Sequence, residues 1–402
     1  MSWTHEDGGP RRLQRVPGRL GAGDGGTGLQ VTTRIDPVAT MVVSDGTDTF
    51  LLRHGFGDGA TATVERIDPL TLEPLSRSVE LPGGPVWPGG MAVSGPDTLH
   101  VVFGRHAHRL DRELQVRAGR ELPRQRPYNS FVPLADGHLA TKDFGGSLPG
   151  APVAPADRRP CELVVLDPLT LDIVARLELP EASIARLSAD GDTVYVVGDS
   201  SLMRVHWDGR RLALDPDFRA VYRSMAGQTY GWDCVLAAGA AWFLDNGDGA
   251  ERFNGSLRGQ GVSTAPLHLV RVELDTAEVT LVEVADGPGG LVSNPPLVDE
   301  ARRVVVGYDS GRGVLCGFDL DTLERRWVRD QDHASHLLLY EESGELVTGD
   351  GTRVVVLDGA TGEEMAAADT GQGIQSVLFP APGPAGSFYT CSLAGVSRVQ
   401  VV

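Results

Sequence analysis

The sequence predicts an all-β protein, and more narrowly a single β-propeller of eight four-stranded blades, with seven blades as the alternative. Apolar strand patterns return roughly every 40 to 65 residues, which is the period of propeller blades. A turn of the type Asp-x-x-Thr recurs at a fixed place in this pattern, and the 51 Gly and 26 Pro suit short strands joined by tight turns. A chain of 402 residues does not require a second domain, because all-β barrels and propellers often exceed the usual single-domain length.

The recurring turn marks the connection between the third and the fourth strand of a blade. Short oxygen-bearing side chains accept backbone N–H hydrogen bonds there and hold a tight turn. The copies are Asp68-Pro69-Leu70-Thr71, Asp167-Pro168-Leu169-Thr170, Glu273-Leu274-Asp275-Thr276, Asp319-Leu320-Asp321-Thr322 and Asp358-Gly359-Ala360-Thr361. Counted from these turns, the innermost strands are expected to begin near Met41, Met91, Phe131, Ile184, Asp233, Pro296, Leu337 and Val377.

The two ends of the chain are expected to meet in the last blade. That blade is one strand short at the C-terminus, and residues 29–35 (LQVTTRI) form a strand pattern without another partner. Pairing the two closes the ring and removes an exposed edge. Residues 1–28 are expected to form a flexible, Gly-rich arm that buries too little apolar surface to order itself, and residues 29–402 the propeller.

Composition restricts the possible binding partners of the protein and its expected cellular compartment. The 54 acidic and 36 basic residues give a net charge of -18, which repels nucleic acid and anionic membrane surfaces. No apolar stretch is long enough for a membrane span or a signal peptide, so a cytoplasmic location is expected. The cysteines form no Cys-x-x-Cys pair and are expected to be buried free thiols; they are Cys161, Cys234, Cys316 and Cys391.

Two segments are similar to the repeats of quinoprotein-like propellers, the pyrroloquinoline-quinone type. They are VTGDGTRVVVLDGATG, from Val347 to Gly362, and DLDTLERRW, from Asp319 to Trp327. The resemblance covers most of the chain as a repeat, and it implies the fold rather than the chemistry, because one scaffold hosts many functions. Only one copy of the repeat, the segment that ends at Trp327, keeps its terminal Trp, and no export signal is recognised. No quinone or other cofactor is therefore predicted.

Function is expected on the face where loops enter the innermost strands and join the second strands to the third, which we call the mouth face. Two loops there are long, Gly145 to Pro160 and Gly247 to Pro266, and each is either a lid or a passive insertion. Five second strands end in a carboxylate: Asp143, Asp199, Asp245, Asp309 and Asp350. These carboxylates either form a ring that attracts a cation or an amine, or are simple turn residues. Arg53, His54, Arg105, His106 and His108 are expected to join this rim.

Lys142 is the only lysine among the 36 basic residues and lies at the base of the first long loop. An ammonium group can be tuned by desolvation where a guanidinium cannot, so Lys142 is a candidate general base, Schiff-base nucleophile or cation for a substrate carboxylate. The alternative is a lone lysine without a role. The acid–base candidates are Lys142, Asp143, Asp233 and His336.

Aromatic and polar residues near the mouth form the predicted ligand-binding set, since small-molecule sites combine aromatic walls with a few convergent polar groups. The set is Trp87, Tyr128, Asn129, Tyr230, Trp232, Asp245, Asn246, Asn294, Tyr308, Asp309, His333 and Gln375. No metal site is predicted, because His333 and His336 would point to opposite faces of a strand. Asp245 to Gly249 resembles a calcium loop but lacks its alternate spacing and distal Glu, so calcium or another divalent metal is only a weaker alternative.

Two functions follow from these patterns. The first is a cytoplasmic enzyme of specialised metabolism, of lyase, hydrolase or cyclase type, that takes a small polar metabolite into the lidded mouth and holds it between Trp232 and Tyr128. The alternative is a non-enzymatic propeller that binds a protein or peptide partner through its rim. The sequence contains no nucleophile-elbow, zinc-protease or phosphate-cradling motif in a fitting context.

Overall fold

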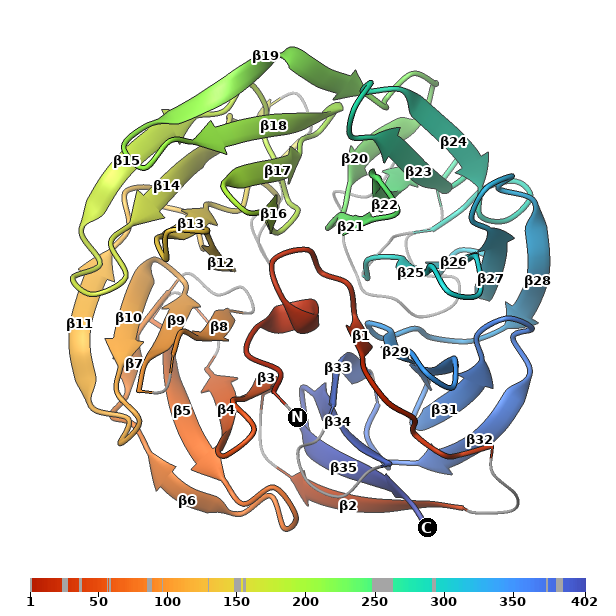
Figure 1. Cartoon of the computed structure of the whole chain (residues 1–402), viewed down its shortest axis with the longest axis horizontal. Coiled ribbons are helices and arrows are strands. Elements are labelled where there is room, and N and C mark those ends of the chain that lie inside the picture. Colours follow the sequence, from red (N-terminus) through yellow and green to blue (C-terminus); the bar gives the residue numbers. More distant parts are fainter. Residues whose placement is uncertain are drawn as a thin grey trace.

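The computed structural model of the chain is a ring of eight antiparallel blades around a central axis (Figure 1). The all-β, eight-bladed prediction is confirmed. The structure describes residues 2–23, 28–35, 38–55, 57, 59–84, 89–95, 97–128, 130–147, 153–154, 157–247, 263–290, 294–373, 375–380 and 386–402.

The first four blades follow one another along the chain, and in each the strands run in order from the axis outward. Blade 1 contains β3 (Ala39–Ser44), β4 (Thr49–His54), β5 (Thr61–Ile67) and β6 (Pro74–Arg77), with β7 (Leu81–Pro82) also on β5. Blade 2 contains β8 (Gly90–Val93), β9 (Leu99–Phe103), β10 (His106–Leu110) and β11 (Val116–Glu121). Blade 3 contains β12 (Val132–Pro133), β13 (Leu139–Lys142), β14 (Glu162–Leu166) and β15 (Ile173–Glu178). Blade 4 contains β16 (Ser188–Asp190), β17 (Thr193–Val197), β18 (Ser201–Trp207) and β19 (Leu212–Val221).

The next three blades repeat this order. In blade 5 the innermost position is shared by β20 (Gln228–Gly231) and β21 (Val235–Ala237), followed by β22 (Ala240–Gly247), β23 (His268–Glu273) and β24 (Val279–Glu283). Blade 6 contains β25 (Leu297–Asp299), β26 (Val304–Asp309), β27 (Val314–Asp319) and β28 (Arg325–Asp330). Blade 7 contains β29 (Leu338–Tyr340), β30 (Glu345–Asp350), β31 (Arg353–Asp358) and β32 (Glu364–Asp369).

Blade 8 joins the two ends of the chain, as predicted. Its strands are β33 (Gln375–Pro380), β34 (Ser387–Ser392), β35 (Gly395–Val401) and the N-terminal β2 (Leu29–Ile35). The antiparallel register of the last pair runs from Leu29 opposite Val401 to Ile35 opposite Gly395. The ring is therefore closed by seven residue pairs of hydrogen-bonded sheet.

Strand composition follows position in the blade. Inner strands lie between two neighbouring blades, and β14 (ELVVL) and β26 (VVVGYD) are buried along their whole length. Such strands favour β-branched residues, which pack well on a pleated surface. The outermost strand of blade 3, β15 (IVARLE), alternates between half-buried and exposed residues, because one of its faces meets solvent.

The predicted Asp turns join third to fourth strands. In four of them Oδ1 of the leading aspartate accepts the N–H groups two and three residues later at 2.8 to 3.0 Å; the aspartates are Asp68, Asp167, Asp319 and Asp358. Four residues after the aspartate the backbone turns left-handed, with φ of 67° at Leu72 and 61° at Leu171. The aspartate bonds thus hold a conformation that leucine would otherwise avoid.

Residues 2–23 run through the middle of the ring (Figure 1). The segment contains a single 3-10 turn, η1 (Glu6–Gly8), and the short β1 (Arg15–Val16), which pairs in parallel with β29 of blade 7. Backbone N–H groups on three innermost strands donate to its carbonyl oxygens at 2.8, 3.0 and 2.9 Å; they belong to Ala189, Leu236 and Leu339. η1 is the one helical element in the described residues, and none there has the length and hydropathy to cross a membrane.

This position differs from the expectation of a flexible arm for residues 1–28. The innermost strands present unpaired backbone edges to the axis, and such groups need hydrogen-bond partners when they are buried. The channel also buries Trp3 and Val16, whose relative exposures are 4% and 2%. A segment too polar to form a core of its own is thus ordered by the channel that surrounds it.

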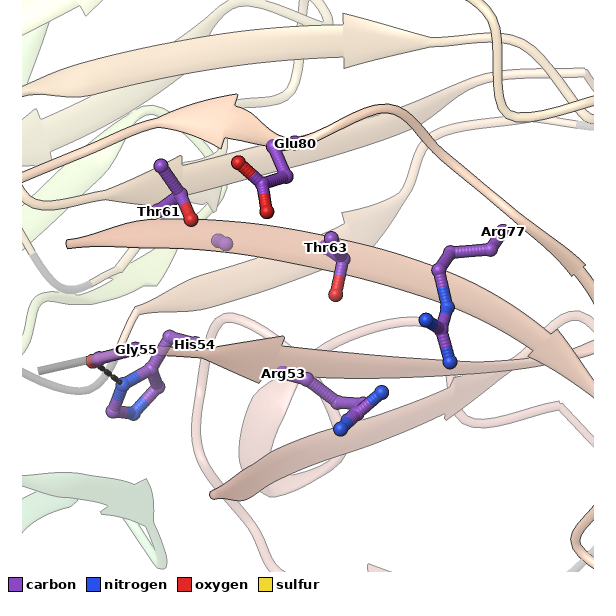
Figure 2. Close-up of a pocket in the computed structure, with 8 residues that line it drawn as sticks. Arg53, His54, Gly55, Thr61, Thr63, Arg77 and Glu80 are labelled. Carbon is purple, nitrogen blue, oxygen red and sulfur yellow. Dashed lines mark hydrogen bonds between the residues drawn. The ribbon is translucent and has the colours of Figure 1, made fainter. Parts of the chain in front are cut away.

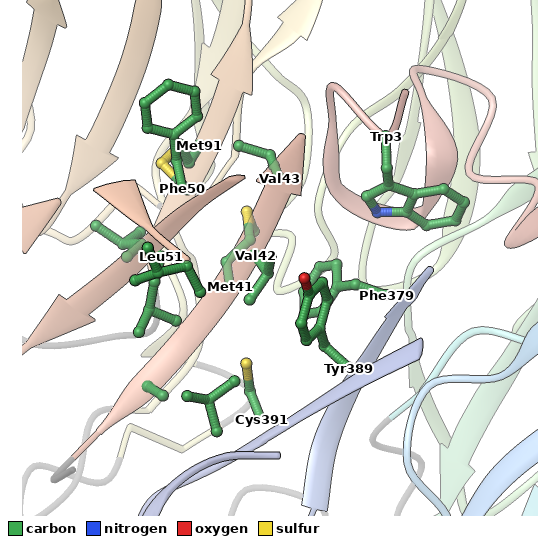
Figure 3. Packing of buried hydrophobic residues seen from close by; sticks show 14 of the residues in the cluster. Trp3, Met41, Val42, Val43, Phe50, Leu51, Met91, Phe379, Tyr389 and Cys391 are labelled. Atoms are coloured by element: carbon green, nitrogen blue, oxygen red, sulfur yellow. The ribbon is translucent and has the colours of Figure 1, made fainter. Parts of the chain in front are cut away.

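The hydrophobic core lies between adjacent blades as well as within them. Figure 3 shows Met41 and Phe50 of blade 1, Met91 of blade 2 and Phe379 of blade 8 in one buried cluster. Trp3 of the N-terminal segment belongs to the same cluster, and its backbone forms two hydrogen bonds with Ser44 at 2.7 and 2.9 Å. The segment therefore adds to the core at the point where the ring closes.

Candidate functional site

Backbone pairing builds the mouth face as predicted, because the end of each second strand meets the entry to an innermost strand. In blade 3, Tyr128 forms an isolated bridge with Asp143. In blade 5, Gly231 of β20 pairs with Asp245 of β22. Most of the second long loop, residues 248–262, and residues 148–152 and 155–156 of the first lie outside the described part of the chain.

Arg158, in the described end of the first long loop, has the most distinctive environment on this face. Its guanidinium carbon lies 4.1 Å from the ring centre of Tyr230, and Nη1 donates to Asp199 Oδ1 at 3.2 Å. The side chain is only 1% exposed. Among the described residues, neither Nε nor Nη2 has a hydrogen-bond partner. Unsatisfied donors on a buried cation cost free energy, so this arrangement suits an anionic ligand.

Asp199 follows β17 in blade 4 and forms the acidic half of this pair. Burial raises its pKa to about 6, although Arg158 acts in the opposite direction. The charge of Glu181 also raises the pKa of Asp199. Glu181 is itself held by the Ser201 hydroxyl and by Arg219, each at 2.6 Å. A carboxyl group with a pKa near 6 can take up and release a proton close to neutral pH.

The backbone beneath Tyr230 is fixed by side chains of the same blade and its neighbour. Asn246 Nδ2 donates to the Tyr230 carbonyl oxygen at 3.0 Å. The Tyr222 hydroxyl accepts the Gly231 N–H at 2.6 Å and donates to the Gly198 carbonyl oxygen at 2.6 Å. Blades 4 and 5 are thus joined directly under the Arg158–Asp199–Tyr230 cluster, which we call the arginine site.

Lys142 and Asp143 lie together in blade 3 and are almost fully buried. Lys142 Nζ donates to the carbonyl oxygens of Asp143 at 3.1 Å and Ser183 at 3.0 Å. Ser183 lies in the segment that leads to blade 4, so this ammonium group bridges two blades. Asp143 forms an ion pair with Arg126, which opposes the rise in the pKa of Asp143 that burial causes.

Most of the mouth carboxylates hold loops rather than forming an open ring. Each of four accepts the backbone N–H of a nearby residue: Asp143 from Glu162 (2.6 Å), Asp245 from His268 (2.6 Å), Asp309 from Gly290 (2.9 Å) and Asp350 from Asp332 (2.9 Å). Asp245 also accepts a hydrogen bond from His268 Nδ1 at 2.8 Å. Burial lowers the pKa of His268, but this bond outweighs it and raises the pKa.

Asp233 and His336, the other two acid–base candidates, face the N-terminal segment in the channel. Arg12 donates to Asp7 at 2.6 Å and lies 3.9 Å from Asp233, and His336 Nδ1 contacts Asp7 at 2.8 Å. Burial acts to raise the pKa of Asp7, but His336 and Arg12 outweigh it and lower the pKa. The four predicted catalytic residues therefore fall into two separate groups, one in blade 3 and one on the axis.

The described aromatic residues of the predicted ligand set are buried; they are Tyr128, Tyr230, Trp232 and Tyr308. Trp232 belongs to a buried cluster with Tyr230, whereas Tyr128 belongs to another cluster with Phe131, so the structure does not bring Trp232 and Tyr128 together. The Tyr308 hydroxyl donates to the Gln331 carbonyl oxygen at 3.1 Å.

Three further predicted residues are polar and lie at blades 6 to 8. Asn294 is buried and donates to the Pro295 carbonyl oxygen at 3.4 Å. His333 is fully buried, and burial lowers its pKa to about 4. Gln375 pairs through its backbone with Ser392 in blade 8. Trp87 and Asn129 lie outside the described residues, as does the side chain of Gln375.

A metal site finds no support in the described part of the chain, where no three His, Cys, Asp or Glu side chains gather to hold an ion. In the calcium-like segment, Asp245 binds His268 and Asn246 binds the Tyr230 backbone, while residues 248 and 249 lie outside the described residues.

Sequence reasoning missed Arg158 and the charged residues of the N-terminal segment. The available signals were weak. Arg158 is one of two adjacent arginines in a loop otherwise rich in Ala and Pro, and Glu6-Asp7 is followed closely by Arg11-Arg12. Neither pattern indicates which charge will be buried, because that depends on the blades packed around it.

No family model matches the chain, and no curated protein matches its sequence. Many solved structures resemble it, among them the following three. BamB from Moraxella catarrhalis has a TM-score of 0.59 and 14% identity, over 92% of this chain and 100% of BamB. The quinohemoprotein alcohol dehydrogenase from Comamonas testosteroni has a TM-score of 0.70 and 12% identity. The related ADHIIG of Pseudomonas putida HK5 has a TM-score of 0.66 and 10% identity, and both dehydrogenases align over 100% of this chain and 80% of their own length.

At these identities the comparisons show the fold alone. The chain has the eight-bladed propeller fold of the quinoprotein-like type, which confirms the resemblance seen in its repeats. The activities of these structural neighbours are not carried over to it.

Proposed function

We propose that the protein binds a small anionic metabolite at the arginine site and acts on it by acid–base chemistry, of lyase, hydrolase or cyclase type. The supporting observation is the Arg158 guanidinium, whose side chain is 1% exposed and which, within the described residues, has one carboxylate partner and two nitrogen atoms without partners. A ligand carboxylate or phosphate would satisfy those donors in the bidentate manner that arginine favours.

The neighbouring groups suit this role. Tyr230 holds the guanidinium plane by stacking, so little side-chain entropy remains to be lost on binding. Asp199 forms an ion pair with Arg158 and so supplies a carboxyl group with a pKa of about 6 beside the proposed anion. Such a group can accept a proton from a bound substrate and return it later. We propose a supporting role for Lys142, whose ammonium donates to two backbone carbonyl oxygens.

The test is native mass spectrometry of the protein after incubation with a small-molecule extract of its own host. Wild type is compared with Arg158→Gln, with Arg158→Lys, and with Arg159→Gln as a matched control at the exposed neighbouring arginine. We expect a small molecule to be retained by wild type and Arg159→Gln, and to be lost from both Arg158 variants, because lysine lacks the planar fork.

Equal retention by all four proteins would contradict the proposal, and so would retention of a stoichiometric protein partner without any small molecule. The second result would move the assignment to the scaffold alternative. Arg158→Lys keeps a charge beside Asp199, so it guards against a variant that merely fails to fold.

We also propose a cytoplasmic location, which is supported by four free, buried cysteines of the kind that persist in a reducing compartment.

A further inference from the structure

We propose that blade 1 carries a second anion-binding site, independent of the arginine site, for small ligands that bear a phosphate, sulfate or carboxylate group. A pocket of about 240 Å³ opens in this blade; among its lining residues are Arg53, His54, Thr61, Thr63, Arg77 and Glu80. Its volume lies below the roughly 300 Å³ at which pockets for drug-sized ligands begin, so the pocket fits a free anion or a small metabolite.

Strand alternation places the polar groups of this pocket on one face. Along β5, Thr61, Thr63 and Glu65 are two residues apart and therefore share a side of the sheet. In the neighbouring strands Arg53 lies opposite Thr63, and Arg77 lies opposite Glu65. Figure 2 shows the guanidinium groups of Arg53 and Arg77 and the hydroxyl of Thr63 directed toward the same space.

Three arginines converge on one buried carboxylate of this blade. Glu65 has a relative exposure of 0% and pairs with Arg34, with Arg77, and with Arg53 at 2.8 Å. Burial acts to raise the pKa of Glu65, but Arg34 and Arg53 outweigh it and lower the pKa, so the carboxylate is ionised. Arg53 and Arg77, which both pair with this carboxylate, also line the pocket.

Glu80 sets the orientation of a ligand in the pocket. It is exposed, lines the pocket and directly precedes β7, whereas Arg53 lies on β4. An anionic group is attracted to Arg53 and Arg77 and repelled by Glu80, so the ligand places its oxyanion on the arginine side and an uncharged or cationic part beside Glu80.

The site also touches the seam of the ring. Arg34 belongs to β2, the strand that completes blade 8, and reaches across to Glu65 of blade 1 and to the Leu72 carbonyl oxygen at 2.7 Å. Because a ligand that binds only the folded state stabilises it, anion binding is expected to raise the melting temperature.

The experiment titrates the full chain with sodium phosphate, sodium sulfate or sodium acetate at constant ionic strength, by calorimetry and thermal unfolding. The variants are Arg77→Gln, Arg53→Gln and Glu80→Gln, and the control is Arg117→Gln, an arginine of blade 2 with similar exposure that pairs with Asp111. We expect saturable binding by wild type and control, about tenfold weaker binding by Arg77→Gln and Arg53→Gln, and tighter binding by Glu80→Gln.

The three salts identify the ligand chemistry. Stronger binding of phosphate and sulfate indicates a doubly charged oxyanion, and comparable binding of acetate indicates a carboxylate. Absence of saturable binding by wild type overturns the proposal, as does equal binding by wild type and both arginine variants. Testing both arginines keeps the result decisive if one variant does not fold. The arginine site is also proposed to accept a phosphate or carboxylate, so the titration is repeated in Arg158→Gln, where the binding that remains belongs to blade 1.

Discussion

At the scale of single residues, identical side chains acquire different chemistry from their surroundings. Asp143 and Asp199 both follow the second strand of a blade, and the sequence offers both as carboxylates of the predicted rim. Asp143 pairs with Arg126 and caps the backbone of Glu162, so it holds a loop. Asp199 instead faces a stacked, buried arginine, and its pKa is raised to about 6. Burial and partner, rather than residue type, decide which carboxylate is a candidate for chemistry.

Asp199 leads to a prediction about pH. Below pH 6 it becomes protonated, so it no longer competes with an anionic ligand for Arg158. The affinity for the metabolite retained at the arginine site should therefore increase as the pH falls from 7 to 5, by up to about tenfold. Isothermal calorimetry across this range measures the effect. Asp199→Asn should bind with an affinity independent of pH in this window, and an unchanged slope in that variant would contradict the assignment.

At the scale of elements, the repeat is held together where blades meet. Trp327 on β28 packs on Gly317 of its own blade and on Gly362 in the turn of blade 7. A Cβ atom at Gly362 would lie 2.6 Å from the Trp327 ring, and the φ of 75° already disfavours other residues there. The equivalent turns in blades 1 and 3 place a leucine at this left-handed position, so in blade 7 it is the contact with Trp327, more than the backbone conformation, that requires glycine.

Gly362→Ala is accordingly expected to destabilise the protein by about 2–4 kcal/mol, as the sum of left-handed strain and overpacking against the ring. Gly371→Ala is the matched control, because Gly371 has a similar φ of 69° and nothing within 4 Å of the added atom. Urea unfolding followed by tryptophan fluorescence gives both values. Equal losses in the two variants would show that the contact with Trp327 contributes nothing.

At the scale of the whole molecule, the axis of the ring is a buried electrostatic network. Three carboxylates (Glu6, Asp7 and Asp233) meet two guanidinium groups (Arg12 and Arg186) and His336, all of them at or below 9% exposure. Burial raises the pKa of Glu6 against the opposing effect of both arginines. Each charge is compensated only while the N-terminal segment lies in the channel, so the segment and the blades stabilise one another.

Arg12→Gln tests this coupling. The change leaves three buried carboxylates with one guanidinium, and we expect a loss of about 3–5 kcal/mol in the free energy of unfolding. Arg11→Gln is the comparison, because Arg11 donates to the Leu236 carbonyl oxygen at 3.0 Å and is only half-buried. Its loss should be about 1 kcal/mol. Comparable denaturation midpoints for the two variants would show that the network is not a major source of stability.

The sequence by itself determined the architecture. The Asp-x-x-Thr turns, the alternation of the strands and the spare strand 29–35 are local signals, and they predict eight blades and the closing pair because turn chemistry and strand periodicity act over a few residues. They also place the mouth face, since strand order fixes which loops lie together.

Only the tertiary structure decided which residues form the proposed sites. Arg158 and Tyr230 are 72 positions apart in the sequence. Arg34 belongs to blade 8 and Glu65 to blade 1, and these two blades meet only where the ring closes. Lys142 is unique in the sequence, yet its ammonium donates to backbone carbonyl oxygens between two blades. The N-terminal segment is too polar to predict as part of a core, and it is ordered by a channel that exists only once the ring has closed. Burial and charge pairing depend on contacts between distant segments, and a local pattern carries no information about them.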